Sequence, residues 1–74
     1  MKNLLIGSRA LTYWNPSVKL SPNSDWDIIS AEPIEGAEWH DPALLNNAEL
    51  ERFTSNARIY FNGHELHVVN PWGL

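Results

Sequence analysis

Four residues in the amino-terminal half of the chain have types and spacing that could carry chemistry. Gly7 and Ser8 close an apolar stretch and open a segment with helical spacing, and Asp25 and Asp27 follow on an alternating stretch. Alternation along a strand sends side chains two positions apart to one face. Two carboxylates on one face can bind a divalent cation. A solvated strand face, or a simple turn and N-cap, gives the same residues without such a role.

These residues resemble the signature of the nucleotidyltransferase superfamily, which is Gly-Ser after the first strand and Asp-x-Asp on the next. The chain resembles small phage-encoded members of that superfamily in four stretches: IGSRAL, NP and SDWDII near the start, and NGHELHVVNPWGL near the end. The resemblance implies that Gly7 and Ser8 contact a nucleotide phosphate. It also implies that Asp25 and Asp27 hold Mg²⁺.

The chain departs from the family pattern at three points. Ser8 and Asp25 are further apart than in the usual motif, so an extra loop is needed. The family's third carboxylate should lie on the last strand, where Glu65 is the available acid and where the resemblance places His67, a poor ligand for Mg²⁺. Phage relatives also continue beyond the equivalent of Leu74. We therefore expect a degenerate site rather than an active enzyme.

The elements that position the first motif are predicted as strand, helix, loop and strand. Residues 3–6 indicate a short buried strand, and Ser8 is a suitable N-cap for a helix over 9–14. A loop follows over 15–24, because two prolines and several serines break regular structure there. Residues 25–30 then predict a second strand, whose other face should pack on the helix.

The middle of the chain is acidic and contains Pro and Gly, which favours a loop or an irregular sheet edge over 31–40. His40 is assigned to this loop. Asp41, followed by proline, predicts the start of a helix with Asp41 as its N-cap. Asn46 with Glu49 resembles a capping box that would restart this helix.

The sequence Asn62-Gly63 between two alternating stretches predicts a hairpin with a two-residue type I′ turn. The predicted register places three pairs opposite each other: Phe61 with His64, Ile59 with Leu66, and Ala57 with Val68. One face of the hairpin is therefore apolar and should pack on the helices. The other face carries Arg58, Tyr60, Glu65, His67 and Val69.

Together these elements predict a single α+β domain over residues 1–74. It should contain a small mixed sheet, made of two amino-terminal strands and the hairpin, packed on short helices as a minimal nucleotidyltransferase-like core. The chain has no cysteine, so disulfides and cysteine-based zinc sites are excluded. Its first apolar run is too short for a signal peptide or a membrane span. We expect a soluble protein of the bacterial host cytoplasm.

The formal net charge of −4 disfavours nucleic acid and anionic membranes as partners, and a basic protein surface is the more suitable one. Four tryptophans are many for 74 residues. Large aromatic side chains supply buried area, and they are also enriched at interfaces. Trp14 and Trp26 are expected to be partly core. Trp39 and Trp72 are left open between core and interface.

The first functional hypothesis is a binding protein without a cofactor. In this view the chain is a monomeric, phage-encoded regulator that uses a former enzyme scaffold to bind host machinery. Bacterial RNA polymerase is the first candidate partner, and the expected effects are inhibition of host transcription initiation, antitermination, or both. The candidate contact residues are Trp39, Trp72, Glu35 and Glu38.

The alternative hypothesis is a metal-dependent, toxin-like nucleotidyltransferase. It would bind nucleotide at Gly7 and Ser8. Its Mg²⁺ would be held by Asp25, Asp27 and Glu65.

Overall fold

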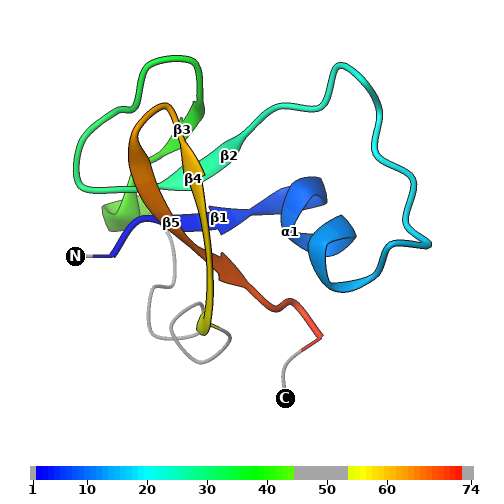
Figure 1. The fold of residues 1–74 in the computed structure, drawn as a ribbon. Coiled ribbons are helices and arrows are strands. Elements are labelled where there is room, and N and C mark those ends of the chain that lie inside the picture. Colours follow the sequence, from blue (N-terminus) through cyan, green and yellow to red (C-terminus); the bar gives the residue numbers. More distant parts are fainter. Residues whose placement is uncertain (1, 45–53, 73–74) are drawn as a thin grey trace.

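The computed structural model describes residues 2–44 and 54–72, which form one mixed sheet, one α-helix and one 3₁₀ turn (Figure 1). The strand order is β3-β2-β1-β5-β4. The elements are β1 (Leu4–Ile6), α1 (Gly7–Trp14), β2 (Asp27–Ile29), β3 (Glu38–His40), the 3₁₀ turn η1 (Pro42–Leu44), β4 (Thr54–Phe61) and β5 (His64–Val69). This arrangement confirms the predicted α+β class and the mixed sheet.

The sheet combines parallel and antiparallel pairs around β1. This strand runs antiparallel to β2 and parallel to β5. Strand β3 lies parallel to β2, and β4 pairs antiparallel with β5 in the hairpin. The described part of the sheet therefore has one strand, β3, more than the sequence predicted.

The connection from β1 to α1 is tighter than the sequence suggested. Gly7 has a φ of +73°, a left-handed conformation that glycine adopts without strain, and α1 begins at this residue. Ser8 thus lies inside the helix, and Ile6 occupies the N-cap without a side-chain capping bond. The prediction that Ser8 caps the helix is wrong, because the turn is completed by the glycine before it. The predicted helix end is confirmed, since Asn15 N–H donates to the Leu11 carbonyl at 2.9 Å.

Strand β2 is shorter than predicted, and Asp25 lies before it, exposed to solvent. The predicted packing of this strand on the helix is confirmed. Ile28 is fully buried in the same core cluster as Ala10, and Trp26 packs against that cluster. The Arg9 guanidinium lies 4.4 Å from the centre of the Trp26 ring, a cation–π contact that joins the helix to the start of β2.

Strand β3 occupies part of the segment predicted as loop or irregular edge. It begins where Glu38 N–H donates to the Trp26 carbonyl at 2.8 Å. The assignment of His40 to a loop is wrong, because His40 pairs with Ile29 as the last residue of this edge strand. Asp41 Oδ1 accepts a bond from Ala43 N–H at 2.9 Å, which confirms it as a cap, although of a 3₁₀ turn. The predicted restart of the helix at Asn46 lies outside the described residues.

The hairpin is the most regular part of the fold. Asn62 and Gly63 have φ values of +51° and +83°, as a type I′ turn requires. Two of the predicted pairs are confirmed: Phe61 with His64 and Ile59 with Leu66. The pair of Ala57 with Val68 is absent from the ladder, because the register shifts between Thr54 and Arg58. In this irregular part Ser55 Oγ donates to the Val68 carbonyl at 2.9 Å.

The sheet curls so that the hairpin turn lies beside the β2–β3 loop (Figure 1). Asn62 Nδ2 donates to the Glu35 carbonyl at 3.1 Å. The rings of Phe61 and Trp26 lie 4.4 Å apart at an interplanar angle of 31°. Gly36 has a φ of +84°, and a Cβ at this position would lie 3.4 Å from the Phe61 ring. These contacts close one end of the curled sheet.

The two sheet faces carry separate apolar clusters. The cluster on the α1 side contains the buried residues Leu5, Ala10, Ile28, Ile34, Leu66 and Val68. Partly buried Trp14 and Trp26 pack against it, as expected for these two tryptophans. The smaller cluster contains Leu4, Ile29 and Val69. No helix within residues 2–44 and 54–72 is long and apolar enough to cross a membrane.

Candidate functional site

Gly7 and Asp27 are in direct proximity at the start of α1. Asp27 pairs with Ile6 across the β1–β2 ladder, so its side chain lies beside the turn at Gly7. A Cβ at Gly7 would collide with the Asp27 carboxylate, which explains why a residue without a side chain stands here. Ser8 is next in the helix and half-buried. The structure thus brings together Gly7, Ser8 and Asp27, while Asp25 stays exposed before the strand.

Asp27 has a partner that the sequence did not predict. His40 Nε2 lies 3.1 Å from Asp27 Oδ1, and the carboxylate can only accept in this bond. The side chains of His40 and Asp27 are 34% and 25% exposed, so the pair sits in a shallow, partly solvated position. The alternation from Glu38 to His40 was the signal for a strand that would have revealed this contact.

The register of the sheet separates Glu65 from Asp27. Leu4 is paired with His67 on β5, and continuing this parallel register places Val69 beside Ile6, in the row of Asp27. An apolar residue therefore stands where a third carboxylate would be needed. Among the described residues, no three His, Cys, Asp or Glu side chains gather into a group that could hold a metal ion.

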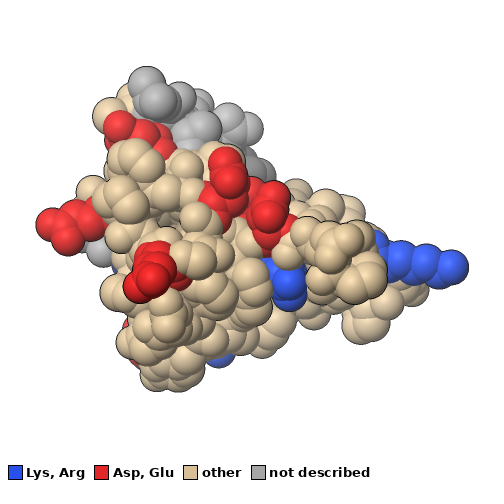
Figure 2. Space-filling view, turned by 90° about the horizontal axis from the view of Figure 1, so that it is seen from above, with Lys and Arg blue, Asp and Glu red and all other residues tan. Residues whose placement is uncertain are grey.

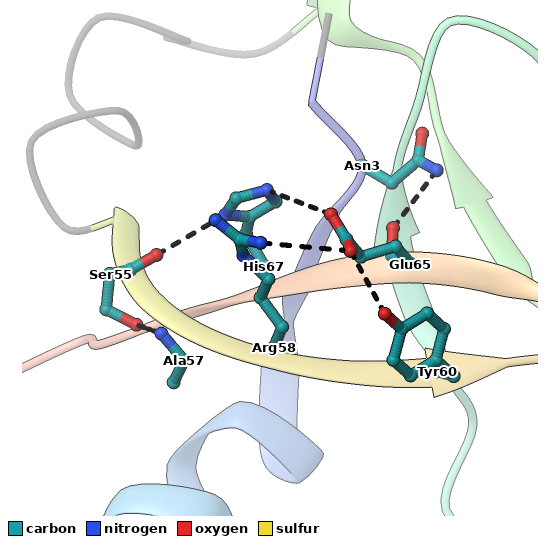
Figure 3. Close-up of polar contacts among 7 residues, drawn as sticks. All are labelled: Asn3, Ser55, Ala57, Arg58, Tyr60, Glu65 and His67. Carbon is teal, nitrogen blue, oxygen red and sulfur yellow. Dashed lines mark hydrogen bonds and ion pairs between the residues drawn. The ribbon is translucent and has the colours of Figure 1, made fainter.

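Glu65 instead lies at the centre of a polar cluster on the hairpin (Figure 3). Tyr60 Oη donates to Glu65 Oε2 at 3.1 Å, and Arg58 Nη1 lies 4.0 Å from the same oxygen. His67 Nε2 lies 3.8 Å from Glu65 Oε1, while His67 Nδ1 donates to the Ser55 carbonyl at 3.4 Å. We call Arg58, Tyr60, Glu65 and His67 the hairpin cluster.

The other side of the sheet is dominated by acidic residues. No lysine or arginine occurs in the sequence between Lys19 and Arg52. We use the name acidic edge for the acids on β2, on β3 and in the segments that flank them: Asp25, Asp27, Glu32, Glu35, Glu38 and Asp41. Glu32, Glu35 and Glu38 are exposed. In Figure 2 acidic side chains lie on the left and centre of the face seen, a basic side chain lies beside the central ones, and a long basic side chain projects on the right.

Three of the four predicted contact residues belong to this region. Trp39 lies on β3 beside Glu38, and Glu35 stands in the loop just before β3. The Trp39 ring is half-buried and donates from Nε1 to the Ser30 carbonyl at 3.0 Å. Trp72 is 56% exposed but follows β5, which β1 and β2 separate from β3. The structure therefore does not place Trp72 on the acidic edge.

An open pocket lies beside the acidic edge. It is lined by Asn3, Ser30, Ala31, Glu32, Pro33, Ile34 and His64. Glu32 is the acid of this lining, so the pocket has the charge and the apolar wall that suit a long basic side chain, which has a hydrocarbon stem and a cationic end.

The geometry defines a small α+β domain with a curled mixed sheet, one acidic edge and one hairpin with mixed charges. Residues 3–71 match the family described as a domain of unknown function (DUF7277), and the chain belongs to this family. No curated protein and no solved structure matches the chain.

Proposed function

We propose that this domain is a binding protein that attaches through its acidic edge to a basic surface of a partner protein. The observation that carries this proposal is the concentration of carboxylates along β2, β3 and their flanking segments, with no lysine or arginine between Lys19 and Arg52. Charge of one sign on one surface accelerates encounter with the opposite sign and excludes partners of like charge.

The chemistry of this surface points to a partner that normally binds nucleic acid. Proteins that hold DNA or RNA line their channels with lysine and arginine, which neutralise phosphates. An acidic protein edge can occupy such a channel and compete with nucleic acid for it. Bacterial RNA polymerase is our first candidate, and the domain would then be a phage-encoded regulator in the host cytoplasm. Its binding would inhibit transcription initiation, alter termination, or both.

The contact on the domain's side would centre on β3. Glu35 and Glu38 are exposed and offer carboxylates, and Trp39 supplies a half-exposed aromatic surface held in place by its bond to Ser30. A standard interface buries about 800 Å² on each partner, so a domain with 4866 Å² of accessible surface can supply one such contact. Trp72 would contribute only if the partner also reached the end of β5.

The proposal is tested by capture from bacterial lysate followed by transcription in vitro. The complete chain is immobilised, retained proteins are identified, and purified RNA polymerase is then assayed for initiation and termination with and without the chain. We expect polymerase to be retained at low salt and released as salt rises, because surface charge attraction is screened. Polymerase that is neither retained nor altered in either step would refute this partner.

The approach of Gly7 to Asp27 favours one second candidate, a metal-dependent nucleotidyltransferase. In that reading Gly7 and Ser8 would bind nucleotide and Mg²⁺ would lie at Asp25 and Asp27, with Glu65 as third ligand. The described side chains do not fit such a site. The β5 residue in the cross-strand row of Ile6 and Asp27 is Val69, which is not an acid, and Glu65 belongs to the hairpin cluster. Titration with ATP or CTP and Mg²⁺ tests it: metal-dependent binding that Asp27→Asn abolishes would support this candidate.

A further inference from the structure

The outer side of β4 is an open sheet edge within the described part of the chain. Strand β4 is last in the strand order, and in the described ladders Arg58, Ile59, Tyr60 and Phe61 are paired with residues of β5. Proteins usually protect such edges with proline, lysine or a bulge. Here the bulge lies before Arg58, and the segment 58–61 is regular, with neither proline nor lysine.

The hairpin geometry determines which backbone groups face outward. In a two-residue hairpin the residues that flank the turn, Phe61 and His64, form a hydrogen-bonded pair, and such pairs recur at every second position. Ile59 therefore also bonds to β5, whereas Arg58 and Tyr60 direct their N–H and C=O groups away from it. The edge thus offers two donors and two acceptors in regular spacing.

We propose that a second copy of this chain pairs antiparallel with β4, with Ile59 on the two-fold axis. In this register Arg58 of each copy stands opposite Tyr60 of the other. Because these are the two residues with outward backbone groups, each such pair exchanges two hydrogen bonds. The sheet of one copy then continues into the sheet of the other, as an isologous contact requires.

The side chains of this edge are complementary to themselves. Arg58 and Tyr60 point to the same face of the hairpin, with side chains in reach of one carboxylate (Figure 3). Across the two-fold axis the guanidinium of Arg58 meets the ring of the opposite Tyr60, a cation–π pair that occurs twice. Tyr60 is 69% exposed, so both rings have surface to bury in this contact.

The charge distribution also favours a second copy as the occupant. Strand β4 carries no acid, and β2 and β3 lie at the other end of the strand order. Of the acidic edge, Glu35 comes close to the hairpin turn, where its carbonyl accepts a bond from Asn62. Antiparallel pairing over residues 58–60 therefore brings no acid of one β4 against the other. The inference does not rest on the proposed function, and it replaces the monomer expected from the sequence with a dimer that presents two acidic edges.

The test is the mass of the complete chain in solution, measured by sedimentation from low micromolar to near-millimolar concentration. We expect the mass to rise from 8.4 kDa toward twice this value. Tyr60→Pro removes the outward N–H, which an edge strand tolerates, and should weaken association about tenfold or more. Arg58→Glu should do the same by placing an acid opposite Tyr60. Tyr13→Ala, an exposed tyrosine on α1, is the control and should leave association unchanged.

A mass of 8.4 kDa at every concentration would overturn the inference. A dimer that both β4 variants leave intact would overturn it equally, since another surface would then hold the two copies. Circular dichroism verifies that each variant is folded. If Tyr60→Pro does not fold, the comparison of Arg58→Glu with Tyr13→Ala decides the outcome.

Discussion

The acidic edge and the β4–β5 hairpin lie in opposite halves of the strand order and differ in how their charges are arranged. On the acidic edge Asp27 has a single ion-pair partner, His40, and the exposed glutamates gather with no lysine or arginine near them in the sequence. On the hairpin each charge meets an opposite charge or a hydrogen bond, with Glu65 at the centre. Glu65, which is engaged within the hairpin, is therefore less available to a basic partner than the exposed glutamates of the acidic edge.

The two regions meet at the tip of the hairpin, where Phe61 joins them. We expect Phe61→Ala to lower the free energy of unfolding by about 2–3 kcal/mol, because the ring packs on Trp26 and against Gly36. Urea denaturation at low micromolar concentration measures the change. Tyr60→Ala on the same strand is the control and should cost less than about 1 kcal/mol, since Tyr60 is mostly exposed. Equal losses of unfolding free energy for the two variants would contradict the conclusion that Phe61 joins the hairpin tip to Trp26 and the β2–β3 loop.

Gly36 and Gly63 have almost the same φ but different surroundings, so alanine substitutions at the two positions can be compared directly. Gly36 and Gly63 have φ values of +84° and +83°, so alanine is strained at both positions by about 1 kcal/mol. A Cβ at Gly36 would lie 3.4 Å from the Phe61 ring, at van der Waals distance, whereas a Cβ at Gly63 meets open space. Both variants should therefore lower the thermal midpoint, and the loss at Gly36 should be no larger than the loss at Gly63, because the contact with Phe61 adds no clash. A clearly larger loss for Gly36→Ala would show that the loop before β3 has no room for a side chain against the hairpin.

The smallest expected effect concerns the ion pair of the acidic edge. His40→Ala should lower the free energy of unfolding by no more than about 1 kcal/mol, because both side chains of the pair are partly exposed. The same urea titration measures it, with His64→Ala at the exposed start of β5 as a matched control. A loss of several kcal/mol would mean that Asp27 and His40 support the fold rather than lie on a surface.

The hairpin was the part of the fold that the sequence predicted best. Asn62-Gly63 requires positive φ at both positions, and alternation then determines the register, so Phe61 and His64 could be paired from local chemistry alone. The register shift near Ala57 could not be predicted, because the alternation of side chains does not mark where a bulge inserts its extra residue.

The acidic edge was predicted less well. Strand β3 has only three residues, and Pro33 and Gly36 in the preceding loop favour irregular structure. The pair of His40 with Asp27 depends on the parallel register of β3 with β2, which is a property of the sheet and not of either segment. The row that holds Asp27 and Val69 likewise follows from strand order, which no local pattern of residues specifies.

The most direct test of the acidic edge compares two variants that each remove one carboxylate. Binding of bacterial RNA polymerase, or of the partner that capture identifies, is titrated with the unaltered chain, with Glu38→Gln and with Glu65→Gln at two salt concentrations. We expect Glu38→Gln to weaken binding several-fold at low salt and less at high salt, and Glu65→Gln to leave it nearly unchanged, because Glu65 is engaged within the hairpin cluster. Equal weakening by the two variants, or weakening by Glu65→Gln alone, would contradict the assignment of the binding surface to the acidic edge.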